Sequence, residues 1–287
     1  MTISRSKKQM IVLLMSVLSL AMPVGCSQDT VSDSADAPDV LIYSDEDAGS
    51  GKNITASTGT GDTLALDNAR GIGTSRSMEG DIMLYCIFVE DSESSWSDEE
   101  IHEMYDGVWK DTAYLESQAA LYGVYLKFSS AWNLVQVPEE EEDRWYDYLM
   151  ETVYNSPEHN YEEVQSYFEE MYEVDDMPFL FFFNKEGRCC CYMATEGMEY
   201  VPEFAMYYPS TMSDDLSIAH ELYHLYGARD LYYPDELKEY AQSYFPDSAM
   251  LIGGRNLDEL TAYLIGWTDT PGAKAAEFMD KTAHIRQ

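Results

Sequence analysis

The chain has 287 residues, of which 45% are hydrophobic, and its 53 acidic and 17 basic side chains give a formal net charge of −36. This length suffices for one large domain or two small ones, and the hydrophobic content is enough for a sizeable core. So negative a chain repels nucleic-acid phosphates and anionic lipid headgroups, so the composition argues against a nucleic-acid-binding protein.

The first 25 residues have the pattern of an export signal. Three basic residues precede an apolar run over residues 10–22, which is too short to span a bilayer comfortably. The run leads to a small residue followed by Cys26, which resembles the lipobox of bacterial lipoproteins, although Pro23 stands where an aliphatic residue is usual. The resemblance implies a signal peptide over residues 1–25 and a lipid (palmitate) anchor on Cys26 in the cell envelope, outside the cytoplasm. An ordinary signal peptide with an incidental cysteine is the alternative.

Residues 26–78 are rich in Ser, Thr, Asp, Gly and Ala and contain few large apolar residues. Such a segment cannot bury enough apolar surface to offset the entropy lost on ordering, so we expect a disordered tether. The functional domain is then expected over residues 79–287. Its cysteines are Cys86 and the consecutive run 189–191, which we interpret as small buried hydrophobes, with one disulfide to Cys86 open as an alternative.

The hydrophobic pattern, capping residues and turn residues predict elements in the following order. We expect a strand over 82–89, a helix from Ser97 to about Ala120, a strand over 121–128, a helix from Pro138 to about Tyr154, a helix over 161–172, a hairpin of strands 178–183 and 188–194, a short strand over 204–208, and a helix capped by Ser213 or Asp214. Strands and helices mix early and helices dominate late. This order predicts an α+β domain, with a twisted mixed sheet and a mainly helical C-terminal subdomain.

The pattern H-E-x-x-H at His220, Glu221 and His224 carries the strongest chemical signal. Residues four apart on a helix share a face, so the two histidines can present imidazole nitrogens to one zinc ion. Glu221 lies one position further round, where it can accept a proton from the attacking water and pass it to a leaving amine. The alternative is a pair of ordinary, partly buried histidines.

The third metal ligand is predicted from the spacing beyond the second histidine. Gly227 follows His224 by three residues, and Asp230 follows Gly227 by three more. Glycine can adopt the left-handed conformation that ends a helix, after which the chain can fold back and bring Asp230 to the metal. Glu259 and Glu236 remain alternatives, although we expect Glu259 to lie in the first turn of its own helix.

The full spacing, H-E-x-x-H-x-x-G-x-x-D up to Asp230, resembles the sites of snapalysin-type and immune-inhibitor-A-type zinc peptidases of the metzincin group. The resemblance covers residues 213–267. Met250, in a Ser-Ala-Met sequence ahead of two glycines, is similar to the Met-turn, whose methionine forms an apolar floor under the zinc. Many metzincins have a tyrosine two residues later, where this chain has Ile252, so that tyrosine cannot be carried over; Tyr232 or the tyrosine after it is a candidate for its role.

The resemblance implies a zincin fold and a zinc-dependent endopeptidase that acts on a protein or peptide substrate at the cell surface. Its ligands would be His220, His224 and Asp230, with Glu221 as general base and Met250 as the floor. The alternative is a catalytically silent surface-binding lipoprotein on the same scaffold. A lost ligand or a lost glutamate would indicate that alternative, and this sequence keeps both.

Overall fold

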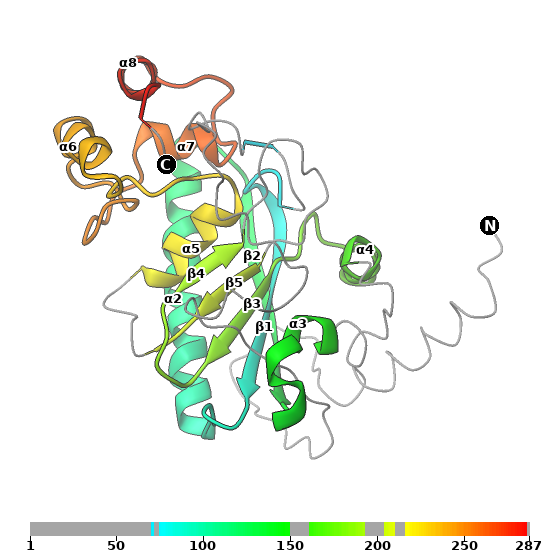
Figure 1. Ribbon diagram of the computed structural model, residues 1–287. Coiled ribbons are helices and arrows are strands. Elements are labelled where there is room, and N and C mark those ends of the chain that lie inside the picture. The colour runs from blue at the N-terminus through cyan, green and yellow to red at the C-terminus, as the bar shows by residue number, and fades with distance from the viewer. Residues whose placement is uncertain (1–69, 72–74, 150–160, 193–203, 210–215, 286–287) are drawn as a thin grey trace.

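The computed structural model describes residues 70–71, 75–149, 161–192, 204–209 and 216–285. These residues contain a five-stranded mixed sheet of order β2-β1-β3-β5-β4, with helices on both faces (Figure 1). The strands are β1 (Gly80–Glu90), β2 (Leu126–Gln136), β3 (Phe179–Phe183), β4 (Cys190–Tyr192) and β5 (Phe204–Tyr207). All neighbouring strands are parallel except β4, which runs antiparallel to β5 at the edge. The predicted α+β class with a mixed sheet is confirmed.

The helical elements lie before, between and after these strands. They are α2 (Asp98–Tyr122), the 3-10 helix η1 (Glu139–Arg144), α3 (Trp145–Tyr148), α4 (Tyr161–Tyr172), α5 (Ser217–Leu225), α6 (Asp235–Tyr244), α7 (Glu259–Leu264) and α8 (Ala273–Thr282). From α5 onward the described chain consists of helices and the segments that join them, as predicted for the C-terminal part.

Strand β1 divides the hydrophobic core into two, because its side chains alternate between the faces of the sheet. Leu84 and Phe88 belong to the core formed with α2, α5 and the C-terminal helices. Tyr85 and Ile87 belong to the core on the opposite face, which α3 covers. Both faces of β1 are buried, which explains its continuous apolar sequence.

Helix α2 forms as predicted, but it continues further than expected. Ser97 and Glu100 make a reciprocal capping box at its start, and Gly123 ends it with φ 72°. The strand predicted over residues 121–128 was therefore wrong, because its first two residues belong to the helix. The actual strand, β2, begins at Leu126 and runs parallel to β1. Polar residues in its middle concealed it in the sequence.

The hairpin predicted for strands 178–183 and 188–194 was also wrong. Strand β5 lies between β3 and β4, with Phe179 opposite Phe204 and Cys191 opposite Ala205. Every residue of β3 and β5 is buried, whereas the cysteines of β4 are partly exposed. The more apolar strand therefore occupies the interior of the sheet, and β4 forms its edge.

Two of the next three predicted helices differ from the observed ones. The helix expected from Pro138 is a 3-10 turn followed by the short α3, and residues 150–154 lie outside the described residues. Helix α4 has the predicted range. Helix α5 begins after Leu216, whose φ of 87° is left-handed and whose side chain makes no capping bond. The predicted caps Ser213 and Asp214 lie outside the described residues.

The segment ahead of β1 is packed against α7 and the turn that follows it. Arg70 donates hydrogen bonds to the carbonyl oxygens of Tyr263 and Thr268, at 2.6 and 2.7 Å. Met78 donates its amide to the Ile265 carbonyl oxygen at 3.1 Å. Of the expected tether, residues 70–71 and 75–78 are thus part of the packed structure. The rest of the tether and the expected signal peptide with Cys26 lie outside the described residues.

No helix within the described ranges is both long enough and apolar enough to cross a bilayer.

Candidate metal centre

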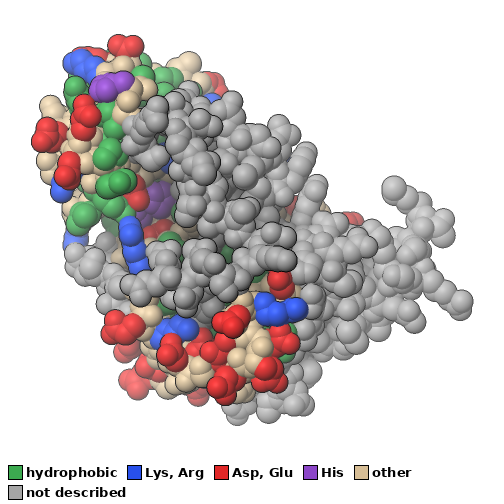
Figure 2. Space-filling model, viewed as in Figure 1, with side chains coloured by type: hydrophobic (Ala, Val, Ile, Leu, Met, Phe, Trp, Pro, Cys, Tyr) green, Lys and Arg blue, Asp and Glu red, His purple; other side chains and the backbone are tan. Residues whose placement is uncertain are grey.

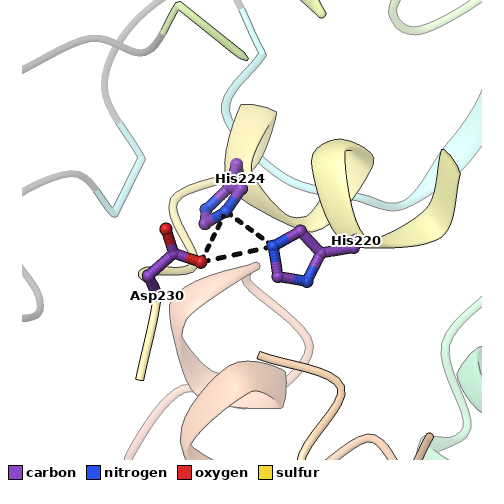
Figure 3. Close-up of side chains that lie close together, drawn as sticks. All are labelled: His220, His224 and Asp230. Carbon is purple, nitrogen blue, oxygen red and sulfur yellow. Dashed lines mark hydrogen bonds and ion pairs between the residues drawn. The ribbon is translucent and has the colours of Figure 1, made fainter. Parts of the chain in front are cut away.

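Three side chains from α5 and the segment after it meet at one point (Figure 3). The Nε2 atoms of His220 and His224 are 3.1 Å apart. The Oδ1 atom of Asp230 lies 3.2 Å from each of them. These three residues form a cluster that could hold a metal ion. The structure therefore brings together the two histidines and the preferred third ligand of the sequence prediction.

A glycine turn places Asp230 beside the helix. Gly227 has φ 103°, a left-handed value that glycine adopts without the clash of a side chain. The Gly227 amide donates to the His224 carbonyl oxygen at 2.9 Å, and the Ala228 amide donates to the Tyr223 carbonyl oxygen at 3.0 Å. These bonds close the end of α5, so the chain reverses as predicted and Asp230 returns to the histidine face.

The second nitrogen of each imidazole contacts a backbone carbonyl. His220 Nδ1 lies 2.8 Å from the Ala249 oxygen, and His224 Nδ1 lies 3.0 Å from the Ala228 oxygen. A carbonyl oxygen only accepts hydrogen bonds, so each Nδ1 carries the proton. In the neutral rings both Nε2 lone pairs then point into the cluster, as metal-binding histidines require.

The electrostatics of the cluster favour a positive charge at its centre. Burial disfavours charge on His224, but the Asp230 carboxylate outweighs it and raises the pKa of His224 to about 9. Burial likewise raises the pKa of Asp230, but His224 and His220 outweigh it and hold that pKa well below its usual range. A carboxylate that raises the pKa of a neighbouring imidazole also attracts a bound cation.

Glu221 lies on α5 between the two histidines in sequence and is 7% exposed. Burial raises the pKa of its carboxyl group, and the positive charge of the two histidines offsets part of that rise. A buried carboxyl group with a raised pKa beside a metal cluster is suited to accept and return a proton.

Glu236 and Glu259, the alternative candidates for the third metal ligand, have other contacts. Glu236 is exposed and contacts His284 Nε2 at 3.1 Å. Glu259 accepts a hydrogen bond from the Ala275 amide at 2.6 Å, at the start of α8. Glu259 lies in the first turn of α7, as expected, while Asp258 provides the side-chain cap of that helix.

Met250 is buried and its segment contacts the cluster through backbone groups. Its carbonyl oxygen accepts the Leu231 amide at 2.9 Å, next to Asp230. The preceding carbonyl, that of Ala249, is the one that binds His220. The turn itself is closed by a bond from the Leu251 amide to the Ser248 carbonyl oxygen at 2.9 Å. The segment predicted as a Met-turn thus orients one histidine and anchors the chain that carries Asp230.

Sequence reasoning missed Asp111, which is buried in α2 and accepts a hydrogen bond from the Ala219 amide at 2.9 Å. Burial raises the pKa of this carboxyl group, and the neighbouring backbone of Ala219, Ile218 and Leu216 offsets part of that rise. Asp111 therefore caps α5 from another helix. The sequence did contain one indication of Asp111. This acidic residue lies between Val108 and the next buried positions of α2, on a face that is otherwise largely apolar.

The four cysteines of the described residues do not take part in the cluster. Cys86 is buried and Cys189, Cys190 and Cys191 are partly buried, and none of the four forms a disulfide. The disulfide to Cys86 that the sequence left open is not formed in this structure, and the interpretation as packed hydrophobes agrees with their placement in the two cores.

No protein-family model matches this chain, and no curated protein matches it.

Proposed function

We propose that this protein is a zinc-dependent endopeptidase of the metzincin type, in which His220, His224 and Asp230 hold the zinc ion and Glu221 is the general base. The observation that carries the proposal is the convergence of two Nε2 atoms and one carboxylate oxygen within 3.2 Å of one another. Bound there, zinc would supply Lewis acidity, which lowers the pKa of water and polarises a peptide carbonyl.

The spacing and chemistry of the three atoms fit zinc. Ligands at 2.0–2.1 Å from a tetrahedral zinc ion lie about 3.3 Å apart, close to the distances between the three ligand atoms. Two imidazoles and one carboxylate are a donor set that zinc accepts, whereas calcium and magnesium select oxygen ligands. Three protein ligands leave one position for substrate or water, as catalytic rather than structural zinc sites do.

The protein's own residues would handle the proton and the orientation of the ligands. Glu221 accepts a proton from the attacking water and donates it to the leaving amine. The Ala249 and Ala228 carbonyls hold the imidazole rings of His220 and His224 in the required tautomer. The apolar face of α5 is buried against the sheet, which keeps the histidine face fixed.

The cellular setting is part of the same proposal. The lipobox resemblance at Cys26 supports export and attachment to a membrane through a lipid, with the domain acting on proteins or peptides outside the cytoplasm. The mixed sheet, the antiparallel edge strand beside α5, and the Met250 turn support a zincin scaffold.

The test uses the full-length chain and measures metal and cleavage separately. Elemental analysis is expected to find about one zinc per chain, and the protein is expected to cleave an unstructured protein such as casein until a chelator is added. Glu221→Gln is expected to keep its zinc and lose about 100- to 10,000-fold in rate. Glu239→Gln, an exposed change on α6, is the matched control.

Each result bears on the proposal. Cleavage by Glu221→Gln at the wild-type rate would reject Glu221 as the base. Zinc binding without cleavage of any substrate would favour the silent surface-binding lipoprotein.

A further inference from the structure

An arginine lies close to the metal cluster. Arg188 is exposed and its Nη2 donates a hydrogen bond to the Tyr232 hydroxyl at 3.3 Å. The Tyr232 ring in turn lies nearly parallel to the His220 ring, with centroids 6.5 Å apart and an interplanar angle of 23°. The guanidinium is therefore separated from a metal ligand by a single side chain.

The backbone that carries Arg188 is held in place on both sides by Tyr208. Gly187 packs so closely on the Tyr208 ring that an added Cβ would lie 2.1 Å from a ring carbon. Cys189 Sγ accepts the Tyr208 amide at 3.4 Å. Tyr208 itself is buried at the end of β5. The backbone on either side of the arginine thus packs against a buried aromatic ring.

This cation stands out against the charge of the whole molecule, which is −36. In Figure 2 acidic side chains crowd the lower part of the visible face. The molecule as a whole repels an incoming carboxylate at long range. An arginine close to the cluster provides the short-range attraction that would select one.

We propose that Arg188, which the Tyr232 hydroxyl positions, binds a carboxylate of the substrate beside the metal cluster, so that peptides with an acidic group near the scissile bond are preferred. A planar guanidinium can donate two parallel hydrogen bonds to a carboxylate. The inference rests on the proposed peptidase function. The carboxylate belongs either to an Asp or Glu side chain or to the C-terminus of the peptide.

The experiment compares quenched fluorescent peptides that differ in one group, with the full-length, zinc-loaded chain. One series moves a single Glu, or a matched Gln, through the positions around the cleavage site. A second series compares a free C-terminal carboxylate with an amide. For the wild type, the preferred acidic peptide is expected to have a kcat/KM about tenfold above its neutral match. The series in which this difference occurs identifies the source of the carboxylate.

Variants then test whether Arg188 causes the preference. Arg188→Gln is expected to remove it, and Arg188→Glu is expected to reverse it in favour of a matched Lys peptide. Arg188→Lys keeps the positive charge and is expected to retain part of the preference for acidic peptides. Arg144→Gln, on the opposite face of the sheet, makes the same change in net charge and is expected to leave the preference intact.

A binding measurement separates recognition from turnover. Glu221→Gln would bind a labelled acidic peptide without cleaving it, and adding Arg188→Gln is expected to weaken that binding about tenfold. Cleavage with equal rates for acidic and neutral peptides would overturn the inference while leaving the peptidase intact. An equal loss for all peptides in Arg188→Gln would also overturn it, because that result indicates a role independent of substrate charge. Absence of cleavage, with zinc bound, would instead reject the proposed function.

Discussion

The Asp111 carboxylate of α2 accepts a hydrogen bond from the Ala219 amide in the first turn of α5, with an Oδ2–N distance of 2.9 Å. Helix α5 has no side-chain cap of its own, because Leu216 occupies the capping position. The first amides of a helix need acceptors and the helix dipole favours a negative charge there. The histidine helix therefore depends on a carboxylate that lies 108 residues earlier in the chain.

Replacing Asp111 tests this dependence. Asp111→Ala would leave buried amides of α5 without an acceptor and is expected to lower the free energy of unfolding by about 2–3 kcal/mol. Asp111→Asn keeps one acceptor oxygen and is expected to lose less. Urea unfolding with a chelator present measures the effect apart from metal binding. Asp106→Ala, at an exposed position of α2, is the matched control, and an equal loss in both variants would refute the capping role.

Zinc affinity should distinguish Asp230 from the alternative third ligands, Glu236 and Glu259. Asp230→Ala removes the oxygen that lies 3.2 Å from both Nε2 atoms and is expected to weaken zinc binding at least about 100-fold, more than loss of an outer contact does. Glu236→Gln is expected to bind zinc normally. Glu259→Gln should also bind zinc but unfold at lower urea, because it weakens the cap of α8. Competition with a colorimetric chelator provides the affinities, and zinc loss in Glu259→Gln would contradict the assignment.

The stability of the fold should depend on the protonation of Asp176. This carboxyl group is fully buried and accepts hydrogen bonds from Tyr226, Met177 and Gln165, yet burial outweighs them and raises its pKa from 3.8 to about 6. The folded state therefore binds this proton more tightly than the unfolded state. The protonated Asp176 carboxyl group therefore makes its full contribution to stability below pH 3.8. This contribution is lost as the pH rises through 6, which lowers the free energy of unfolding by ~3 kcal/mol.

The comparison of wild type with Asp176→Asn isolates this contribution. The stability of the wild type relative to the variant is expected to decline between about pH 4 and 6.5 and then to level off. Urea unfolding at a series of pH values, with a chelator present, provides the two curves. Glu170→Gln, at an exposed position of α4, should run parallel to the wild type. A constant difference between wild type and Asp176→Asn over this range would contradict the raised pKa.

The buried Met250 should matter for packing more than for metal binding. Met250→Leu conserves volume and is expected to change the free energy of unfolding by less than about 1.5 kcal/mol. Met250→Ala leaves a cavity and is expected to lower it by about 2–5 kcal/mol. Both variants should keep their zinc, because the turn contacts the cluster through the Ala249 and Met250 carbonyls. Zinc loss in Met250→Leu would show that the thioether itself supports the site.

The sequence was sufficient for the parts of the site whose geometry is local. Histidines four residues apart share a helix face whatever surrounds them, and Gly227 could be assigned its left-handed turn from its offset alone. The preference for Asp230 over Glu259 had the same basis, because the turn brings only Asp230 back along the helix. Ser97 likewise predicted the start of α2 from a capping pattern within four residues.

The sequence was insufficient wherever the outcome depended on competition between distant segments. Strands β3 and β4 are close in the sequence and suggested a hairpin, but β5 offered a more apolar neighbour and lies between them. Asp111 could be recognised as unusual on a buried face, yet its partner is set by how α2 crosses α5. Arg188 reaches Tyr232 only because the sheet order places β4 beside α5.

The docking of Arg70 has a mechanical consequence. Tension on the chain ahead of Arg70 reaches the carbonyl groups of Tyr263 and Thr268 before it reaches β1. From Tyr263 it passes along α7 to Asp258, whose carboxylate accepts the Ser248 hydroxyl of the turn beside the metal cluster. A pull on the N-terminal chain would therefore load the C-terminal helices, which also hold the turn that orients His220, before it loads β1.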